Sequence, residues 1–512
     1  MLGPRQVTRH DQTSTVADTA RYCRGRRRVH AGRLWTASQR GSRRAGLRGV
    51  PCPARVAARR VRTRSCTKVD LRCGQLVAPL DYAHPEGEQI TLQIIRARHK
   101  EQSERIGSLI FNPGGPGFPG LPHMPFLLSW LPESLLTRFD LVSLDRRGTG
   151  GSAPINCPTV PDDPETSTPN VLTEAGFAHA LQLERLQSQL CLQVLSSRAP
   201  HFNTQAAARD IDRLRAAVGD QTLTFLGQSY GAKVGAEYAH RFPTSVRAAV
   251  LDGPPEPSAT IFDSNVRQTK GFERSFHQYA KDCASRKTCQ LGNPRAFVTR
   301  LVAKADATPI PSGRPRDDRP ADGSDVLNAV RAALYDQARW PDLDEILYET
   351  GFGNSAGIFA MIENMYGPPV DDSAPADSTD ANYVTNCNDS APGPTDEQIR
   401  TTARTMARDY PLFGAHAAFD LFVCKTWQPQ RAVLEPPVAP TPNRLLVVGT
   451  IHDAVTPYAG AVALTRILGN ATLLTWDGEN HTAMGYSTCI AEAAARYLID
   501  LTVPPEGTHC PP

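Results

Sequence analysis

Residues 223–243 read LTFLGQSYGAKVGAEYAHRFP, and this stretch places one serine between two glycines where an apolar run meets a helical pattern. The apolar run at 223–227 is typical of a buried strand, and the residues after the serine carry small side chains at helical spacing. At such a strand-turn-helix junction, Gly227 and Gly231 relieve crowding, so that the serine can hold a strained backbone. We therefore expect Ser229 to be a candidate nucleophile, exposed beside the amides and dipole of a helix N-terminus.

The G-x-S-x-G pattern is a weak signal alone, because composition gives about 0.15 chance matches in a chain of this length. A serine hydroxyl also needs a base, and that base an orienting acid, in the chain order Ser, Asp/Glu, His. Asp453 follows the apolar run of RLLVVGTIHDAVTP (444–457), and His481 follows that of ATLLTWDGENHTA (471–483). Their order and their places after strands predict that Asp453 orients His481, which activates Ser229.

Two other residues compete for these roles. Asp252 in VLDGP also follows a strand-like run, and His452 directly precedes Asp453. Loop or capping roles explain both of these residues equally well. We prefer Asp453 as the acid and His481 as the base.

Acyl transfer further requires hydrogen-bond donors for the developing oxyanion. The segment FNPGGPGFPG (111–120) follows an early strand, and its glycines leave backbone N–H groups unobstructed. We expect the amides of Gly115 and Tyr230 to form the oxyanion hole. A plain Gly/Pro turn is the alternative for this segment.

Apolar, β-rich runs recur along the chain with helical stretches between them, which is the pattern of a mostly parallel sheet covered by helices on both faces. The predicted strands lie at 90–97, 107–112, 139–145, 223–227, 246–253, 444–449 and 471–476.

Between Pro254 and about Pro442 the strand-like runs stop and helical periodicity replaces them, with proline- and aspartate-rich loops between the helices. Two helical stripes are evident, formed by Phe262, Val266, Phe272, Phe276 and Tyr279, and by Val326, Leu327, Val330 and Leu334. We interpret this region as a helical insertion that caps the sheet. The predicted organisation is a basic disordered tail (1–65), a first core half (66–256), a helical cap (257–440) and a second core half (441–512).

The net charge of +4 is unevenly distributed, because residues 1–65 contain 17 Arg, no Lys and two Asp, giving +15 and leaving −11 for the rest. Such a segment, poor in apolar residues, is predicted to stay disordered. Without aromatic or amphipathic order it does not indicate a nucleic-acid partner. It also lacks the apolar stretch of a secretory signal, and no run of 18 apolar residues indicates a membrane span.

Cysteine usage favours an oxidising compartment instead. Ten of the 12 cysteines lie after residue 65, and no CxxC pair suggests a metal site. Their spacing suggests that neighbours pair, although spacing alone does not establish connectivity. The suggested pairs are Cys66 with Cys73, Cys157 with Cys191, Cys283 with Cys289, Cys387 with Cys424, and Cys489 with Cys510. We therefore expect a secreted or cell-envelope protein.

Six motifs occur in the order of a known family: NPGGPG, LVSLDRRGTGGS, GQSYGA, VLDG, GTIHDAVTP and ENHTA. The chain from Cys66 to Cys510 thereby resembles the tripeptidyl-aminopeptidase-like α/β hydrolases, which are bacterial serine peptidases related to proline iminopeptidases. The resemblance implies an α/β-hydrolase fold and an exported enzyme that removes short peptides from free N-termini, some relatives being carboxylesterases. It also implies the roles of Ser229, Asp453 and His481 given above.

Other positions of these motifs have less certain roles. Thr456 matches a family threonine near the acid, although a turn-stabilising hydroxyl explains it equally well. We interpret Asp145 and Arg147 of DRRG as structural. Asn480 stands where the family usually has glycine, and because Asn tolerates a positive φ, we expect the turn to be kept.

An aminopeptidase must also bind the substrate ammonium, and Asp389 in NCNDSAP is a candidate carboxylate for this, with a solvated acid as the alternative. We expect a monomeric serine hydrolase that acts on peptides through an acyl-enzyme, with no metal or organic cofactor. A carboxylesterase with the same triad is the alternative. A non-catalytic hydrolase-like binding protein is a third possibility, disfavoured because all three triad residues are present.

Overall fold

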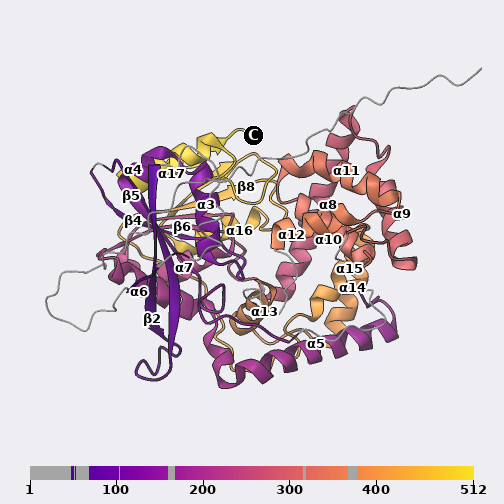
Figure 1. Ribbon diagram of the computed structural model, residues 1–512, viewed down its shortest axis with the longest axis horizontal. Helices are drawn as coiled ribbons and strands as arrows, with labels where there is room; N and C mark the ends of the chain where they lie inside the picture. Colours follow the sequence, from indigo (N-terminus) through magenta and orange to yellow (C-terminus); the bar gives the residue numbers. More distant parts are fainter. Residues whose placement is uncertain are drawn as a thin grey trace, which may run out of the picture.

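The structure is a computed structural model that describes residues 48–50, 52, 68–102, 104–158, 168–314, 319–366 and 378–512. Its centre is a ten-stranded sheet in the order β1-β2-β3-β5-β4-β6-β7-β8-β9-β10 (Figure 1). The strands are β1 (Arg48–Val50), β2 (Val69–Pro79), β3 (Gln89–His99), β4 (Gly107–Asn112), β5 (Phe139–Leu144), β6 (Leu223–Gln228), β7 (Val246–Asp252), β8 (Leu445–Thr450), β9 (Ala471–Trp476) and β10 (His509–Cys510).

The sheet is mostly parallel. The strands from β5 through β4 to β10 pair in parallel, whereas β1, β2 and β3 are joined to each other and to β5 by antiparallel ladders. All seven predicted strands are confirmed. The three that the sequence did not reveal lie towards the two edges, where β2 is only partly buried and β10 has two residues.

Helices cover both faces of the sheet, as predicted. Helices α6 (Thr204–Ala217), α7 (Tyr230–Arg241) and α16 (Ala459–Leu468) pack on one face, and α3 (Gly120–Trp130), α4 (Glu133–Arg138) and α17 (Thr488–Asp500) on the other. Successive strand residues point to opposite faces, and because helices cover both faces, β4, β5, β6 and β8 are buried along their whole length. On β6, for example, Phe225 belongs to the first packed layer and Leu226 to the second.

A second group of helices lies between β7 and β8 and forms the lobe at the right of Figure 1. Both predicted helical stripes are confirmed, the first on α8 and the second on α10 and its C-cap, and most of their residues enter the core of this lobe. The helices are α8 (Ile261–Ser285), α9 (Pro294–Ala307), α10 (Gly323–Ala333), α11 (Trp340–Gly351), α12 (Ala356–Tyr366), α13 (Ser378–Asp389), α14 (Asp396–Asp409) and α15 (Gly414–Ala417).

Helix α5 (Glu174–Leu195) precedes β6 in the chain but runs beside α14 along the bottom of Figure 1. Its residues Phe177 and Ala180 share a small apolar core with Ile399 and Ala403 of α14. The helical lobe therefore includes a segment from outside 257–440, so the domain limits of the sequence analysis stay a prediction.

Five disulfides cross-link the described part of the chain, and four of them join the predicted pairs: Cys157–Cys191, Cys283–Cys289, Cys387–Cys424 and Cys489–Cys510. The fifth prediction is wrong, because Cys73 on β2 bonds to Cys52 and not to Cys66. The physical reason is β1, which pairs with β2 in antiparallel register and brings the chain at Cys52 next to Cys73. Residues 48–50 and 52, assigned above to the tail, thus belong to the sheet edge, and the rest of 1–65 lies outside the described residues.

Within the described ranges, each helix is too short or too polar to cross a lipid bilayer.

Candidate active site

The turn between β6 and α7 has the geometry of a strained elbow. Ser229 lies between the two elements with φ 56°, a left-handed conformation that is costly for a residue with a side chain. A Cβ on Gly227 would overlap the carbonyl oxygen of Gly231, and one on Gly231 would overlap the carbonyl oxygen of Asn112. Both glycines are therefore required by close backbone contacts, and the turn predicted around Ser229 is present.

The loops after the neighbouring parallel strands β8 and β9 bring Asp453 and His481 together. The Nδ1 atom of His481 lies 2.9 Å from Oδ2 and 3.1 Å from Oδ1 of Asp453. Asp453 is fully buried and also accepts hydrogen bonds from the amides of Val455 and Thr456, each at 2.8 Å. These donors fix the orientation of the carboxylate toward the ring.

Thr456, the threonine near the acid, contacts both partners. Its Oγ1 donates to Oδ2 of Asp453 at 2.9 Å and lies 3.2 Å from Nδ1 of His481. The hydroxyl therefore braces the Asp453–His481 pair from one side.

The two competing residues lie elsewhere. Asp252 is buried behind the turn of His481, where it accepts from the amides of Ala483 at 2.9 Å and Met484 at 3.1 Å. Burial raises its pKa to about 6. His452 points toward Glu479, whose Oε1 lies 3.8 Å from its Nε2. The geometry thus favours Asp453 over Asp252 and His481 over His452.

A cavity of about 1000 Å³ opens between the sheet and the helical lobe. Ser229, Tyr230 and His481 line it from the sheet side, together with Gly115. The helical lobe contributes residues of α8, α10, α12 and α13, so a molecule bound to the serine would contact both parts of the chain.

The glycine-rich loop after β4 lies against the elbow. Gly114 and Gly115 have φ of 113° and 107°, which residues with side chains rarely adopt. A Cβ on Gly114 would lie 2.7 Å from the carbonyl oxygen of Gln228 and 3.1 Å from Cβ of Ser229. The structure therefore brings together Gly115, Tyr230 and Ser229, the predicted oxyanion donors and nucleophile.

Asp389 does not reach this cavity. Its side chain is buried at the end of α13, where it accepts a hydrogen bond from the amide of Thr204 at 2.9 Å. Lys233 Nζ lies 3.6 Å away, and the hydroxyl of Thr204 donates to the same carboxylate. These groups already occupy the carboxylate, and the role of Asp389 in binding a substrate ammonium stays a prediction.

The helical lobe contacts both loops that carry Asp453 and His481, which the sequence did not reveal. The amide of His481 donates to the carbonyl oxygen of Tyr335 at 2.9 Å, and the two rings meet edge to face. Arg274 of α8 donates to the carbonyl oxygens of Ile451 at 3.1 Å and Asp453 at 3.2 Å. Only the fold shows these contacts, since more than 140 residues separate each pair.

Asn480 has a different role from the one expected. The positive φ falls on Thr482, at 66°, and not on Asn480. The side chain of Asn480 instead accepts from the amide of Gln337 at 2.9 Å and donates to Asp336 at 3.3 Å. Asn480 therefore connects the histidine loop to the helical lobe.

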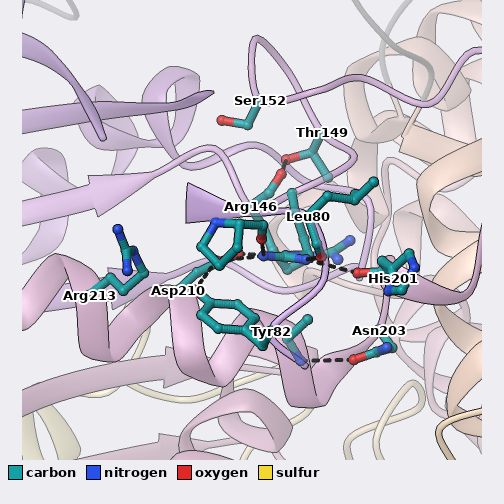
Figure 2. A network of polar contacts seen from close by, with 12 residues as sticks. Leu80, Tyr82, Arg146, Thr149, Ser152, His201, Asn203, Asp210 and Arg213 are labelled. Atoms are coloured by element: carbon teal, nitrogen blue, oxygen red, sulfur yellow. Dashed lines mark hydrogen bonds and ion pairs between the residues drawn. The ribbon is translucent and has the colours of Figure 1, made fainter. Parts of the chain in front are cut away.

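Arg147 is structural, as expected. Its guanidinium is fully buried and bonds to Asp210 through Nε at 2.7 Å and Nη2 at 2.8 Å. It also donates to the carbonyl oxygens of Leu80 and His201. Figure 2 shows Leu80, His201 and Asp210 gathered around this polar network. Asp145 is also structural, because it accepts from the backbone amides of Leu121 and Gly151.

The sheet order, the elbow after β6 and the acid and histidine after β8 and β9 define an α/β hydrolase with a serine at the nucleophile position. Comparison with known proteins narrows this class to a family. Residues 410–510 match a family model described as TAP-like protein. The serine protease Hip1 of Mycobacterium tuberculosis is 34% identical over 461 residues, covering 86% of this chain and 87% of that protein.

Two further relatives have different names. Carboxylesterase B of M. tuberculosis is 34% identical over 457 residues, with 86% of each chain covered. A tripeptidyl aminopeptidase of Streptomyces lividans is 29% identical over 470 residues, covering 86% of this chain and 85% of that protein. The chain belongs to this TAP-like family of α/β hydrolases, and it is a serine hydrolase.

Proposed function

We propose that Ser229, His481 and Asp453 form the catalytic triad of an acyl-transfer reaction. The observation that carries this proposal is the 2.9 Å contact between His481 Nδ1 and Asp453 Oδ2, at the cavity that Ser229 also lines. With Nδ1 held by the carboxylate, Nε2 of His481 is the atom that removes the hydroxyl proton of Ser229. Asp453 then offsets the positive charge of the imidazolium.

The oxygen of Ser229 attacks the substrate carbonyl, and the amides of Gly115 and Tyr230 donate hydrogen bonds to the oxyanion. His481 next gives its proton to the leaving group, which departs as the C–N or C–O bond breaks. Water, deprotonated by His481, then attacks the carbonyl of the acyl-enzyme. The bond to the Ser229 oxygen breaks, His481 returns the proton to that oxygen, and the acid is released. These steps need no metal or organic cofactor.

For the substrate we propose a short peptide cleaved from a free N-terminus, as the name of the S. lividans tripeptidyl aminopeptidase suggests. The ammonium then requires a carboxylate in the cavity. Among the described residues that line it, Glu256 and Asp336 carry one. Both groups have partners, since Glu256 pairs with Arg267 at 2.9 Å and Asp336 accepts from the amide of Ala338 at 3.0 Å.

Those occupied carboxylates favour a second candidate, a carboxylesterase with the same triad. The described lining also includes apolar side chains that suit an acyl group, among them Ile261, Met361 and Met365. Carboxylesterase B is as similar to this chain as Hip1 is.

We also propose that the protein works as a monomer outside the cytoplasm. Five disulfides support the location, because disulfides persist in oxidising compartments. Detection of the native protein in the culture or envelope fraction tests the location, and light scattering tests the monomer.

The experiment for the substrate compares three probes: a free-amine tripeptide p-nitroanilide, its N-acetylated twin and p-nitrophenyl butyrate. Cleavage of the free-amine anilide alone supports the aminopeptidase. Cleavage of the ester with neither anilide supports the carboxylesterase and removes the peptidase proposal. In both cases the Ser229→Ala variant must be folded and inactive, and activity retained by that variant would overturn the triad.

A further inference from the structure

Arg146 lies beneath the glycine-rich loop and is 2% exposed. Its Nε donates to the carbonyl oxygen of Pro116 at 3.1 Å, and its Nη2 donates to the same oxygen. Pro116 directly follows Gly115 in the chain, so two hydrogen bonds from one rigid guanidinium fix the turn that carries the first proposed oxyanion donor.

The same guanidinium contacts the residue of the second donor. It lies over the ring of Tyr230, 5.4 Å from the ring centre, within the range of a cation–π interaction. The Tyr230 hydroxyl is held in turn by Oγ1 of Thr204 at 2.5 Å, and Thr204 bonds to Asp389. Arg146 is thus packed between the two chain segments whose amides must point at one oxygen atom.

A third contact anchors Arg146 to the helical lobe. Its Nη1 donates to Oγ1 of Thr385 on α13 at 3.2 Å, and Thr385 is fully buried. The position of the guanidinium is therefore set from three directions, by the loop, the elbow and the lobe.

The charge of Arg146 has no direct counter-charge. Within the described ranges it forms no ion pair with a carboxylate, and Asp389 and Asp210 act on it only at longer range. An arginine stays protonated in proteins, so its charge is kept in a region from which water is largely excluded. A carboxylate in direct contact would neutralise most of this positive charge. Without such a contact, the guanidinium can stabilise negative charge that develops nearby.

We propose that Arg146 is a positioning residue of the oxyanion hole. It holds the Pro116 turn and Tyr230 in the arrangement that aims the Gly115 and Tyr230 amides at the oxyanion, and its charge favours that oxyanion. This inference rests on the proposed triad. It assigns a role to the second residue of the DRRG segment, which the sequence analysis left without one.

The test compares Arg146→Met and Arg146→Lys with the parent protein, using p-nitrophenyl butyrate for kcat and KM and phenylboronic acid for affinity. The boronic acid forms a tetrahedral adduct with a serine and so measures oxyanion stabilisation without turnover. We expect kcat of Arg146→Met to fall about 10- to 100-fold, below the loss caused by deleting a direct oxyanion donor, while KM changes less than about threefold. Boronic acid affinity should fall by a similar factor, and Arg146→Lys should recover most of both.

The matched control is Arg98→Met, which removes an exposed arginine of β3 and should leave all three quantities unchanged. Arg146→Met with parental kcat and boronic acid affinity would overturn the inference, as would a rise in KM with unchanged kcat. If Arg146→Met does not fold, Thr385→Val tests the inference instead, because it removes the hydrogen bond from Arg146 to Thr385 and keeps the guanidinium. Boronic acid affinity should then fall about two- to fivefold, on the order of one lost hydrogen bond, and an unchanged affinity would overturn the inference.

Failure of this inference is distinct from failure of the proposed function. An inactive Ser229→Ala with a fully active Arg146→Met would leave the triad in place and remove only the role of Arg146. An active Ser229→Ala would remove the triad and with it the basis of both.

Discussion

Arg146 and Arg147 are neighbours in the chain and are equally buried, yet their surroundings are opposite in character. Arg147 forms two hydrogen bonds to one carboxylate, Asp210, and donates its other hydrogen bonds to carbonyl oxygens of the chain. Arg146 binds a carbonyl oxygen, a hydroxyl and an aromatic ring, and no carboxylate among the described residues. The partners therefore indicate a structural role for one arginine and a role at the active site for the other.

The largest expected effect is on stability, at the Arg147 pair. Asp210→Asn leaves a buried guanidinium without its counter-charge, so the free energy of unfolding should fall by about 3–5 kcal/mol. Urea unfolding measures this loss. The kcat of the folded fraction should stay within twofold of the parent, and a kcat loss larger than that of Arg146→Met would reverse the comparison.

Arg146→Met should show the converse behaviour. This change breaks no ion pair among the described residues but leaves the buried acceptors of Pro116 and Thr385 without their donor, so the free energy of unfolding should fall by about 1–3 kcal/mol, less than in Asp210→Asn. The same preparation should nevertheless show the 10- to 100-fold loss of kcat given above. Urea unfolding measures the free energy of unfolding, and steady-state kinetics measures kcat. A destabilisation as large as that of Asp210→Asn would show that Arg146 is structural too.

Glu184 is a buried acid whose ionisation should make the stability of the protein depend on pH. Glu184 accepts a hydrogen bond from Tyr383, and burial raises its pKa from 4.5 to about 7. Between these pH values the folded protein binds more protons at this site than the unfolded chain, so its contribution to stability falls as pH rises. The parent protein should therefore lose about 3 kcal/mol more unfolding free energy between pH 4 and pH 8 than Glu184→Gln does.

Urea unfolding at the two pH values measures this difference, with Glu492→Gln as the control because Glu492 is exposed on α17. An identical pH dependence in the parent and Glu184→Gln would show that Glu184 does not titrate in this range.

The smallest effect is expected at Asn480. Asn480→Gly removes two side-chain hydrogen bonds between the histidine loop and the helical lobe, to Gln337 and Asp336. Loss of these contacts should lower kcat about three- to tenfold, on the order of 1 kcal/mol, without changing the ionisation of the triad. A pH–rate profile checks this, and a profile shifted along the pH axis would contradict a purely positioning role.

The sequence predicts what is local. The elbow at Ser229, the central strands and the helices of the lobe follow from patterns within about 20 residues, and the structure confirms them. The order Ser, Asp, His after β6, β8 and β9 is also visible in the sequence, because parallel strands bring their carboxyl ends to one edge of the sheet.

Non-local contacts account for what the sequence did not predict. Cys52 was missed because β1 is a three-residue edge strand with no apolar pattern of its own. The contacts of Asp389 with Thr204 and Lys233 were not predicted, because these residues are more than 150 positions away in the chain. Arg146 offered no signal, since its partner Thr385 lies 239 residues away.

The central claim is that Ser229 is the nucleophile oriented against His481 and Asp453. Its most direct measurement is labelling of the intact protein with a fluorophosphonate, followed by mass spectrometry of its peptides. The account predicts one phosphonyl group per chain, on Ser229, and labelling at least about 100-fold slower in His481→Ala, which lacks the base. Labelling at another residue, or an undiminished rate in His481→Ala, would contradict it.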